Sequence, residues 1–123
     1  MDKQKAFDIA YKGIITQNSA SAVPQGSRMS CRYKLNDKKC TIGHLIEDKD
    51  YNPSIEKLSL EYLYRGAKLP SYLMDLPLHF LSDLQEAHDH SVRIARKDND
   101  LFIKSFLEQM NTIANHYGLQ LPA

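Results

Sequence analysis

The chain has 123 residues, 42% apolar and 25% charged, which is the composition of an ordinary globular protein and predicts a single domain spanning residues 1–123. A net charge of +1 excludes a globally basic nucleic-acid binder, so nucleic acid is not an expected partner. Two cysteines are too few for a disulfide scaffold, and no apolar run approaches the roughly 20 residues of a membrane span. Because residues 1–13 also lack the apolar segment of a secretory signal, we expect a cytoplasmic protein without a membrane partner.

The first predicted element is a helix that is capped by Asp2 and ends near Gln17. Its apolar stripe, spaced three and four residues apart, consists of Phe7, Ala10, Tyr11, Ile14 and Ile15. The segment from Asn18 to Ser30 contains Pro24 and Gly26 and shows no periodicity. We predict a polar loop for it.

A tight β-hairpin that runs into a short helix is predicted between Cys31 and Asp48. Asn36-Asp37 separates two runs that alternate apolar and charged residues, and this is a signal for a short hairpin turn. In this register Leu35 faces Lys38, and side chains alternate between two faces. The apolar face then holds Cys31, Tyr33, Leu35, Cys40 and Ile42, and the charged face holds Arg32, Lys34, Lys39 and Thr41. After Gly43, about one helical turn is expected from His44 to Asp48.

The second half of the chain predicts helices. Asn52-Pro53 is a helix start, and the apolar pattern continues to Gly66. A connector with one helical turn follows, and then a helix from Pro77 whose inward stripe is Phe80, Leu81, Leu84, Ala87, His88 and Val92. Asp98 caps the last helix, which ends at Tyr117 before Gly118, with an inward stripe of Leu101, Phe102, Phe106, Met110, Ile113, Ala114 and Tyr117. The predicted fold class is mostly helical α+β, with one two-stranded antiparallel hairpin packed on about four helices.

The hairpin segment resembles a family of small proteins encoded by phages and prophages. The matching residues are Cys31, Tyr33, Lys39, Cys40, Ile42, Gly43, Leu45, Ile46, Asp48, Tyr51, Pro53 and Glu56. Leu84-Gln85 and His88-Asp89 form a second match, whereas Ser30 and His44 depart from the glycine and the small residue of the family pattern. The resemblance implies a small soluble fold and a phage context, and it implies no chemistry.

Two cysteines and two histidines, Cys31, Cys40, His44 and His88, are the residue types of a tetrahedral zinc site. Eight residues separate the cysteines, which is too many for the usual zinc motif, and diagonal neighbours on a hairpin are too far apart for an unstrained disulfide. The sequence therefore favours two reduced core thiols and no metal or cofactor.

His88 lies on an inward helix stripe, and we expect a core histidine that is hydrogen-bonded to hairpin backbone. Asp89 is not expected to orient it, because consecutive helix residues diverge. His44 and Asp48 have the spacing of a metal or acid/base pair, but the sequence shows no third ligand or nucleophile nearby. Because known nucleophile and phosphate-loop motifs are also missing from the sequence, it favours a protein that is not an enzyme.

Local charge is the strongest functional signal. Between residues 28 and 39, five cations and one acid give a local charge of +4 in a chain of +1. The expected partner-binding surface combines these cations with the adjoining acidic turn and consists of Arg28, Arg32, Lys34, Lys38, Lys39, Glu47, Asp48 and Asp50. A charged hairpin face that only confers solubility remains open as an alternative.

Two functions follow from these observations. The first is a non-enzymatic, phage-encoded accessory protein that binds a host protein in the host cytoplasm, for host take-over or counter-defence, as the resemblance implies. The second is a module that binds or sequesters a small nucleotide-like anion in a pocket between hairpin and helices, using Arg32 or Arg28 with His88. The sequence leaves open whether the chain forms a homo-oligomer.

Overall fold

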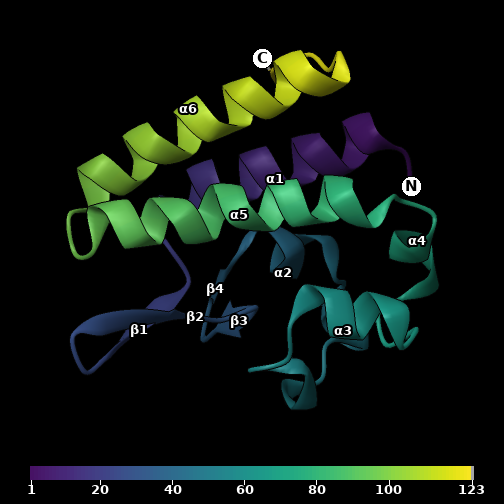
Figure 1. The fold of residues 1–123 in the computed structure, drawn as a ribbon, viewed down its shortest axis with the longest axis horizontal. Helices are drawn as coiled ribbons and strands as arrows, with labels where there is room; N and C mark the ends of the chain where they lie inside the picture. Colours follow the sequence, from purple (N-terminus) through teal and green to yellow (C-terminus); the bar gives the residue numbers. More distant parts are fainter. Residues whose placement is uncertain (123) are drawn as a thin grey trace.

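The structure is a computed structural model that describes residues 1–122. Within these residues it contains six α-helices, two 3-10 turns and two antiparallel strand pairs, so the predicted mostly helical α+β class is confirmed (Figure 1). The elements are α1 (Lys3–Gln17), β1 (Ala22–Gln25), β2 (Arg28–Cys31), β3 (Lys34–Leu35), β4 (Lys38–Lys39), α2 (Thr41–Leu45), η1 (Asp48–Asp50), η2 (Pro53–Ile55), α3 (Leu60–Arg65), α4 (Ser71–Met74), α5 (Leu78–Ala95) and α6 (Asn99–Tyr117).

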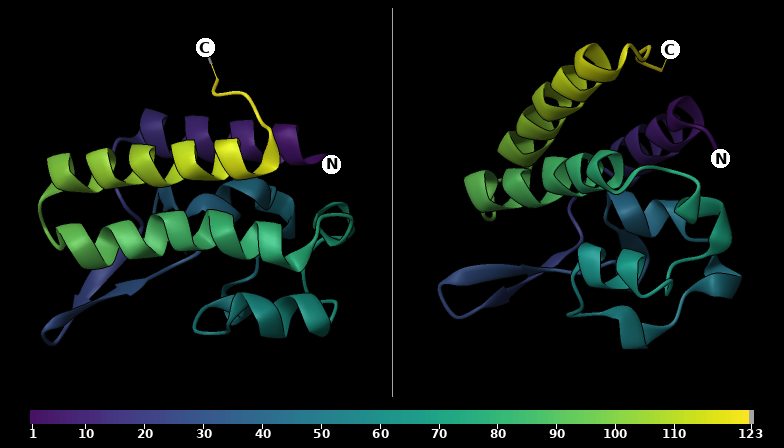
Figure 2. Two further views of the ribbon diagram at one scale, coloured as in Figure 1. Left: turned by 45° about the horizontal axis from the view of Figure 1, so that its top comes forward. Right: turned by 45° about the vertical axis from the view of Figure 1, so that its right-hand side comes forward.

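Helix α5 lies at the centre of the molecule. The long helices α1 and α6 pack on one side of it, and α2, α3 and the strands lie on the other (Figures 1 and 2). Helices α5 and α6 run antiparallel, because only residues 96–98 connect them. Because α5 contacts elements of both layers, a side chain on α5 can reach either the helical core or the strands.

Aromatic and aliphatic side chains from the three long helices form the core. Phe7, Phe80 and Phe106 are completely buried, as their stripes predict. The ring of Phe102 packs edge-on against His88 with 5.6 Å between ring centroids. Leu101 was predicted on the same stripe, and this is wrong, because its side chain is 38% exposed. It lies in the first turn of α6 next to the buried Phe102, and consecutive residues of a helix project in directions about 100° apart.

The β3–β4 hairpin has the predicted register. Lys34 pairs with Lys39 and Leu35 with Lys38, and Asn36 adopts the positive φ of 57° that the turn requires. Thr41 is not on the charged face: it is completely buried, and its hydroxyl donates to the Leu84 carbonyl oxygen at 2.7 Å. The strand alternation ends before Thr41 because α2 begins there.

A second hairpin replaces the loop that was predicted from Asn18 to Ser30. Ala22 pairs with Cys31 and Gln25 with Arg28, and the turn between them contains Gly26 at a φ of 61°. Pro24 argued against a strand, but each strand of a two-stranded sheet has an unpaired side that tolerates proline. The hairpin projects from the body beside the C-terminal half of α5 (Figure 2).

The helix predicted between Asn52 and Gly66 is broken. A single 3-10 turn, η2, is followed by an irregular stretch and then by α3, whose N-terminus is capped by the Ser59 hydroxyl. Glu56 explains the break, because its carboxylate accepts hydrogen bonds from the backbone amides of Tyr33 and Lys34, each at 3.0 Å, and from the Tyr51 hydroxyl at 2.7 Å. The non-helical backbone at Glu56 thus allows its carboxylate to bind the start of the β3–β4 hairpin.

The helix ends follow the predicted capping residues. Asp2 accepts from the Lys5 amide at 2.8 Å, and Asp98 accepts from the Leu101 amide at 3.1 Å. Gly118 has a φ of 67°, and the Leu119 amide donates to the Ala114 carbonyl oxygen at 2.8 Å, which is a Schellman contact. Within residues 1–122, no helix combines the length and the apolar character needed to cross a lipid bilayer.

Candidate functional site: a basic groove beside helix α5

A groove of about 820 Å³ separates the β1–β2 hairpin from the C-terminal half of α5. We call this cavity the basic groove. It is lined by Pro24, Gly26, Ser27, Arg28, Met29, Cys31, Asp89, Val92, Arg93, Arg96 and Lys97. One wall comes from the hairpin that the sequence did not predict, and the other comes from the helix that it predicted best.

Positive charge dominates this groove. Four cations and one acid line it, which gives a formal charge of +3. Arg93 forms an ion pair with Glu86, whereas Arg28, Arg96 and Lys97 have no ion-pair partner among residues 1–122. All four cations are exposed at the rim. The groove therefore presents three uncompensated cations to whatever enters it.

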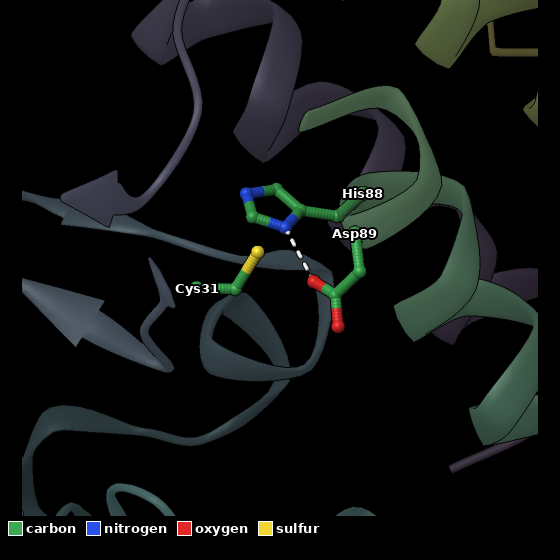
Figure 3. A group of neighbouring side chains, drawn as sticks. All are labelled: Cys31, His88 and Asp89. Carbon is green, nitrogen blue, oxygen red and sulfur yellow. Dashed lines mark hydrogen bonds and ion pairs between the residues drawn. The ribbon is translucent and has the colours of Figure 1, made fainter. Parts of the chain in front are cut away.

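Cys31 and Asp89, which line the groove, cluster with the buried side chain of His88 (Figure 3). The Nδ1 atom of His88 lies 2.8 Å from a carboxylate oxygen of Asp89, and the Ser21 backbone amide donates to His88 Nε2 at 3.0 Å. His88 is thus the predicted core histidine, but its backbone partner is Ser21, just before β1, and not the hairpin for which the bond was predicted. The expectation that Asp89 does not face it is wrong, because the Asp89 side chain turns back along the helix to reach Nδ1.

These contacts fix the protonation of the cluster. Since Nε2 accepts a hydrogen bond from the Ser21 amide, it carries no proton, so the proton of the His88 ring is on Nδ1, which donates a hydrogen bond to Asp89. Burial, and then the charge of Asp89, raise the pKa of the Cys31 thiol far above its usual value. The histidine has no free acceptor atom for the thiol, and the thiol stays protonated. This arrangement does not supply an activated nucleophile.

The cations predicted on the β3–β4 hairpin lie elsewhere and are mostly paired. Lys39 Nζ contacts an Asp48 carboxylate oxygen at 2.7 Å, Lys34 Nζ lies 3.8 Å from the same oxygen, and Lys38 Nζ donates to the Ser19 hydroxyl. The hydrogen bond from Lys39, followed by the charges of Lys39 and Lys34, holds the pKa of Asp48 below its usual range. The acidic turn that was expected to extend the binding surface thus neutralises it.

The remaining predicted site residues are dispersed. Arg28 lines the basic groove, whereas Arg32 is half-buried outside it and its Nε has no hydrogen-bond partner within residues 1–122. Asp50 accepts a hydrogen bond from the Tyr72 hydroxyl, and Glu47 is an exposed partner of Lys49. The proposed pocket pair of Arg32 and His88 does not line the groove, although His88 lies directly behind Asp89.

His44 and Cys40 have structural roles in separate places. His44 Nε2 lies 2.9 Å from the Gln17 side-chain oxygen, and burial lowers the pKa of this histidine to about 4. The Cys40 sulfur accepts the Gly43 amide at 3.3 Å and caps α2. Asp48 lies on η1 and His44 on α2, and their hydrogen-bond partners are Lys39 and Gln17 respectively, so the spacing of four residues does not produce a His–Asp pair. Both cysteines are free, as predicted, but Cys31 is half-buried rather than in the core.

Sequence reasoning missed four groove residues, namely Asp89, Arg93, Arg96 and Lys97. A signal for three of them was present, since Arg93, Arg96 and Lys97 lie close together in the sequence at the C-terminal end of the predicted helix. What the sequence did not reveal was the hairpin opposite them, which forms the other wall of the groove.

Comparisons with protein-family models, with curated proteins and with solved structures found no match for this chain. The interpretation of the site therefore relies on its geometry alone.

Proposed function

We propose that this chain is a non-enzymatic binding protein whose basic groove holds an acidic segment of a protein partner. The observation that carries the proposal is the convergence of Arg28, Arg96 and Lys97 on one cavity, with no acidic partner of their own in residues 1–122. Cations without partners form charge-assisted contacts with carboxylates or phosphates and steer the approach of an acidic partner.

The shape of the groove favours a segment of chain over a compact ligand. Its walls are a projecting hairpin and the end of a helix, and its cations are exposed at the rim (Figure 2). A small-molecule site buries most of its ligand and places its polar groups inside. An extended acidic peptide can instead lie along the groove and contact all three cations. The resemblance to phage proteins makes a host protein, bound in the host cytoplasm, the proposed partner.

A small nucleotide-like anion is the second candidate, because the volume of about 820 Å³ and the apolar side chains of Met29 and Val92 suit a ligand of that size. Arg28 would contact the phosphate in this case. Arg32 and His88, which were expected to contribute, do not line the groove.

The test uses a fluorescently labelled peptide of about ten glutamates and measures anisotropy at several salt concentrations. Wild type is compared with the triple variant Arg28→Glu, Arg96→Glu and Lys97→Glu. The matched control is Lys5→Glu, Lys12→Glu and Lys104→Glu, three exposed cations outside the groove that change the net charge equally. We expect the groove variant to lose at least tenfold in affinity, the control to bind within about twofold of wild type, and wild-type binding to weaken with salt.

An equal loss in both variants would contradict the proposal, because it would reflect only net charge. Titration with ATP as a second probe separates the two candidates. Binding of ATP that depends on Arg28, without binding of the peptide, would favour the small anion. A pull-down from host-cell lysate identifies a candidate host protein only if the groove variant loses it and the control retains it.

A further inference from the structure

We propose that Cys31, His88 and Asp89 form a binding site for a divalent transition-metal ion of the zinc class at the basic groove. The ligand-type atoms of the three residues lie within 4.8 Å of one another. Bonds to zinc of about 2.0–2.3 Å place the atoms of a tetrahedral ligand set roughly 3.3–3.8 Å apart. Movements of about 1 Å or less therefore convert the cluster into a coordination sphere.

The chemistry of the donors fits this class of ion. A thiolate, an imidazole nitrogen and a carboxylate are the three ligand types that zinc and cobalt accept. Cys31 and Asp89 line the groove, so the ion has an open path from solvent. Three protein ligands leave the fourth tetrahedral position free for water on the groove side, as in open zinc sites.

Binding rearranges two protons. The Cys31 thiol loses its proton to solvent as the metal–sulfur bond forms. The metal also replaces the Nδ1 proton of His88, which moves to Nε2, so one proton is released in total and Asp89 binds as the carboxylate that it already is. The proton on Nε2 then faces the Ser21 amide, which is itself a donor.

Ser21 resolves this conflict. It is completely buried, and its hydroxyl has no hydrogen-bond partner among the described residues. Rotation of this side chain toward Nε2, together with a shift of the Ser21 amide away from the ring, provides an oxygen acceptor for the new N–H. Ser21 is then a positioning residue, because an outer partner on the second ring nitrogen orients a metal-bound histidine and raises its affinity.

This site ties β2 to α5, because Cys31 comes from the hairpin and the other two ligands come from the helix. The assignment departs from the sequence-based expectation of two core thiols without metal. It does not depend on the occupant of the groove, and it stands or falls separately from the proposed function.

Cobalt titration of the reduced full chain provides the test. We expect a thiolate-to-cobalt charge-transfer band in the near ultraviolet, visible bands of tetrahedral intensity, and loss of both on adding zinc. Cys31→Ser should abolish the charge-transfer band, and Asp89→Asn should weaken cobalt binding at least tenfold. Ser21→Ala should weaken binding while retaining the band. His90→Gln, on the same helix outside the cluster, is the matched control and should bind as wild type does.

A second measurement needs no variant. Zinc should slow the alkylation of Cys31 by iodoacetamide at least tenfold, as followed by peptide mass spectrometry, with little effect on the buried Cys40. The proposal is overturned if wild type gives no charge-transfer band, if Cys31→Ser retains it, or if zinc leaves the alkylation rate of Cys31 unchanged.

Discussion

Two regions of this molecule carry clustered cations, and they differ in what those cations contact. On the β3–β4 hairpin, Lys34 and Lys39 converge on Asp48, and the Lys34 ammonium also lies 5.2 Å from the centroid of the Tyr51 ring. In the basic groove, the three cations without a partner point into a cavity. A high local charge is therefore available for binding only where the fold supplies no counter-charge. The hairpin lysines form ion pairs within the fold, whereas the three groove cations form none within residues 1–122.

Glu56 provides the largest expected contrast between the two regions. It holds the β3–β4 hairpin through two backbone amides and the Tyr51 hydroxyl. Glu56→Ala leaves these donors without their charged acceptor, and we expect the free energy of unfolding to fall by about 3 kcal/mol. Glu86→Ala is the control on the groove side, where an exposed ion pair with Arg93 should contribute less than about 1 kcal/mol. Urea denaturation of both variants checks this, and equal losses would contradict the division of roles.

Sequence reasoning succeeded where local signals determine the structure. Asn36 defines the β3–β4 turn and its register, and Asp98 and Gly118 mark the ends of α6. These features depend on turn and cap chemistry within a few residues, so the sequence contains enough information to place them.

The failures involve contacts between distant segments. Nothing near Glu56 in the sequence indicates that its carboxylate will cap amides more than 20 residues earlier, and that contact interrupts the predicted helix. Likewise, the sequence does not indicate that the Asp48 carboxylate forms an ion pair with Lys39, nine residues earlier. One wall of the groove was missed because Pro24, Gly26 and the lack of periodicity predicted a loop where the β1–β2 hairpin forms.

A smaller effect on the free energy of unfolding is expected from the protonation of His44 on α2. His44 packs against α1 and has a folded pKa of about 4, against about 6.5 in the unfolded chain, owing first to burial and then to the nearby Lys39. The unfolded state therefore binds the additional proton between these two values, and stability falls as pH decreases from 6.5 to 4. Because the ring is only half-buried, we expect the loss to be about 1–2 kcal/mol. Thermal melts of wild type and His44→Gln should show this pH dependence only in wild type.

The smallest effect on stability is expected where the effect on binding is largest. The triple groove variant, Arg28→Glu, Arg96→Glu and Lys97→Glu, replaces exposed side chains that form no ion pair within residues 1–122. Its free energy of unfolding should change by less than about 0.5 kcal/mol, while its binding to the acidic peptide should be lost.

The same reversal at Lys34 and Lys39 should act in the opposite sense. It places two new carboxylates beside Asp48, so the melting temperature should fall, whereas binding to the acidic peptide by the remaining folded protein should persist. Melting curves and anisotropy titrations give a melting temperature and a peptide affinity for each variant. We expect the groove variant to keep its melting temperature and lose affinity, and the hairpin variant to lose melting temperature and keep affinity. The hairpin variant contradicts this division if it melts at the wild-type temperature and no longer binds the peptide. In that case Lys34 and Lys39 can leave Asp48 to contact the peptide, and the binding surface extends beyond the groove.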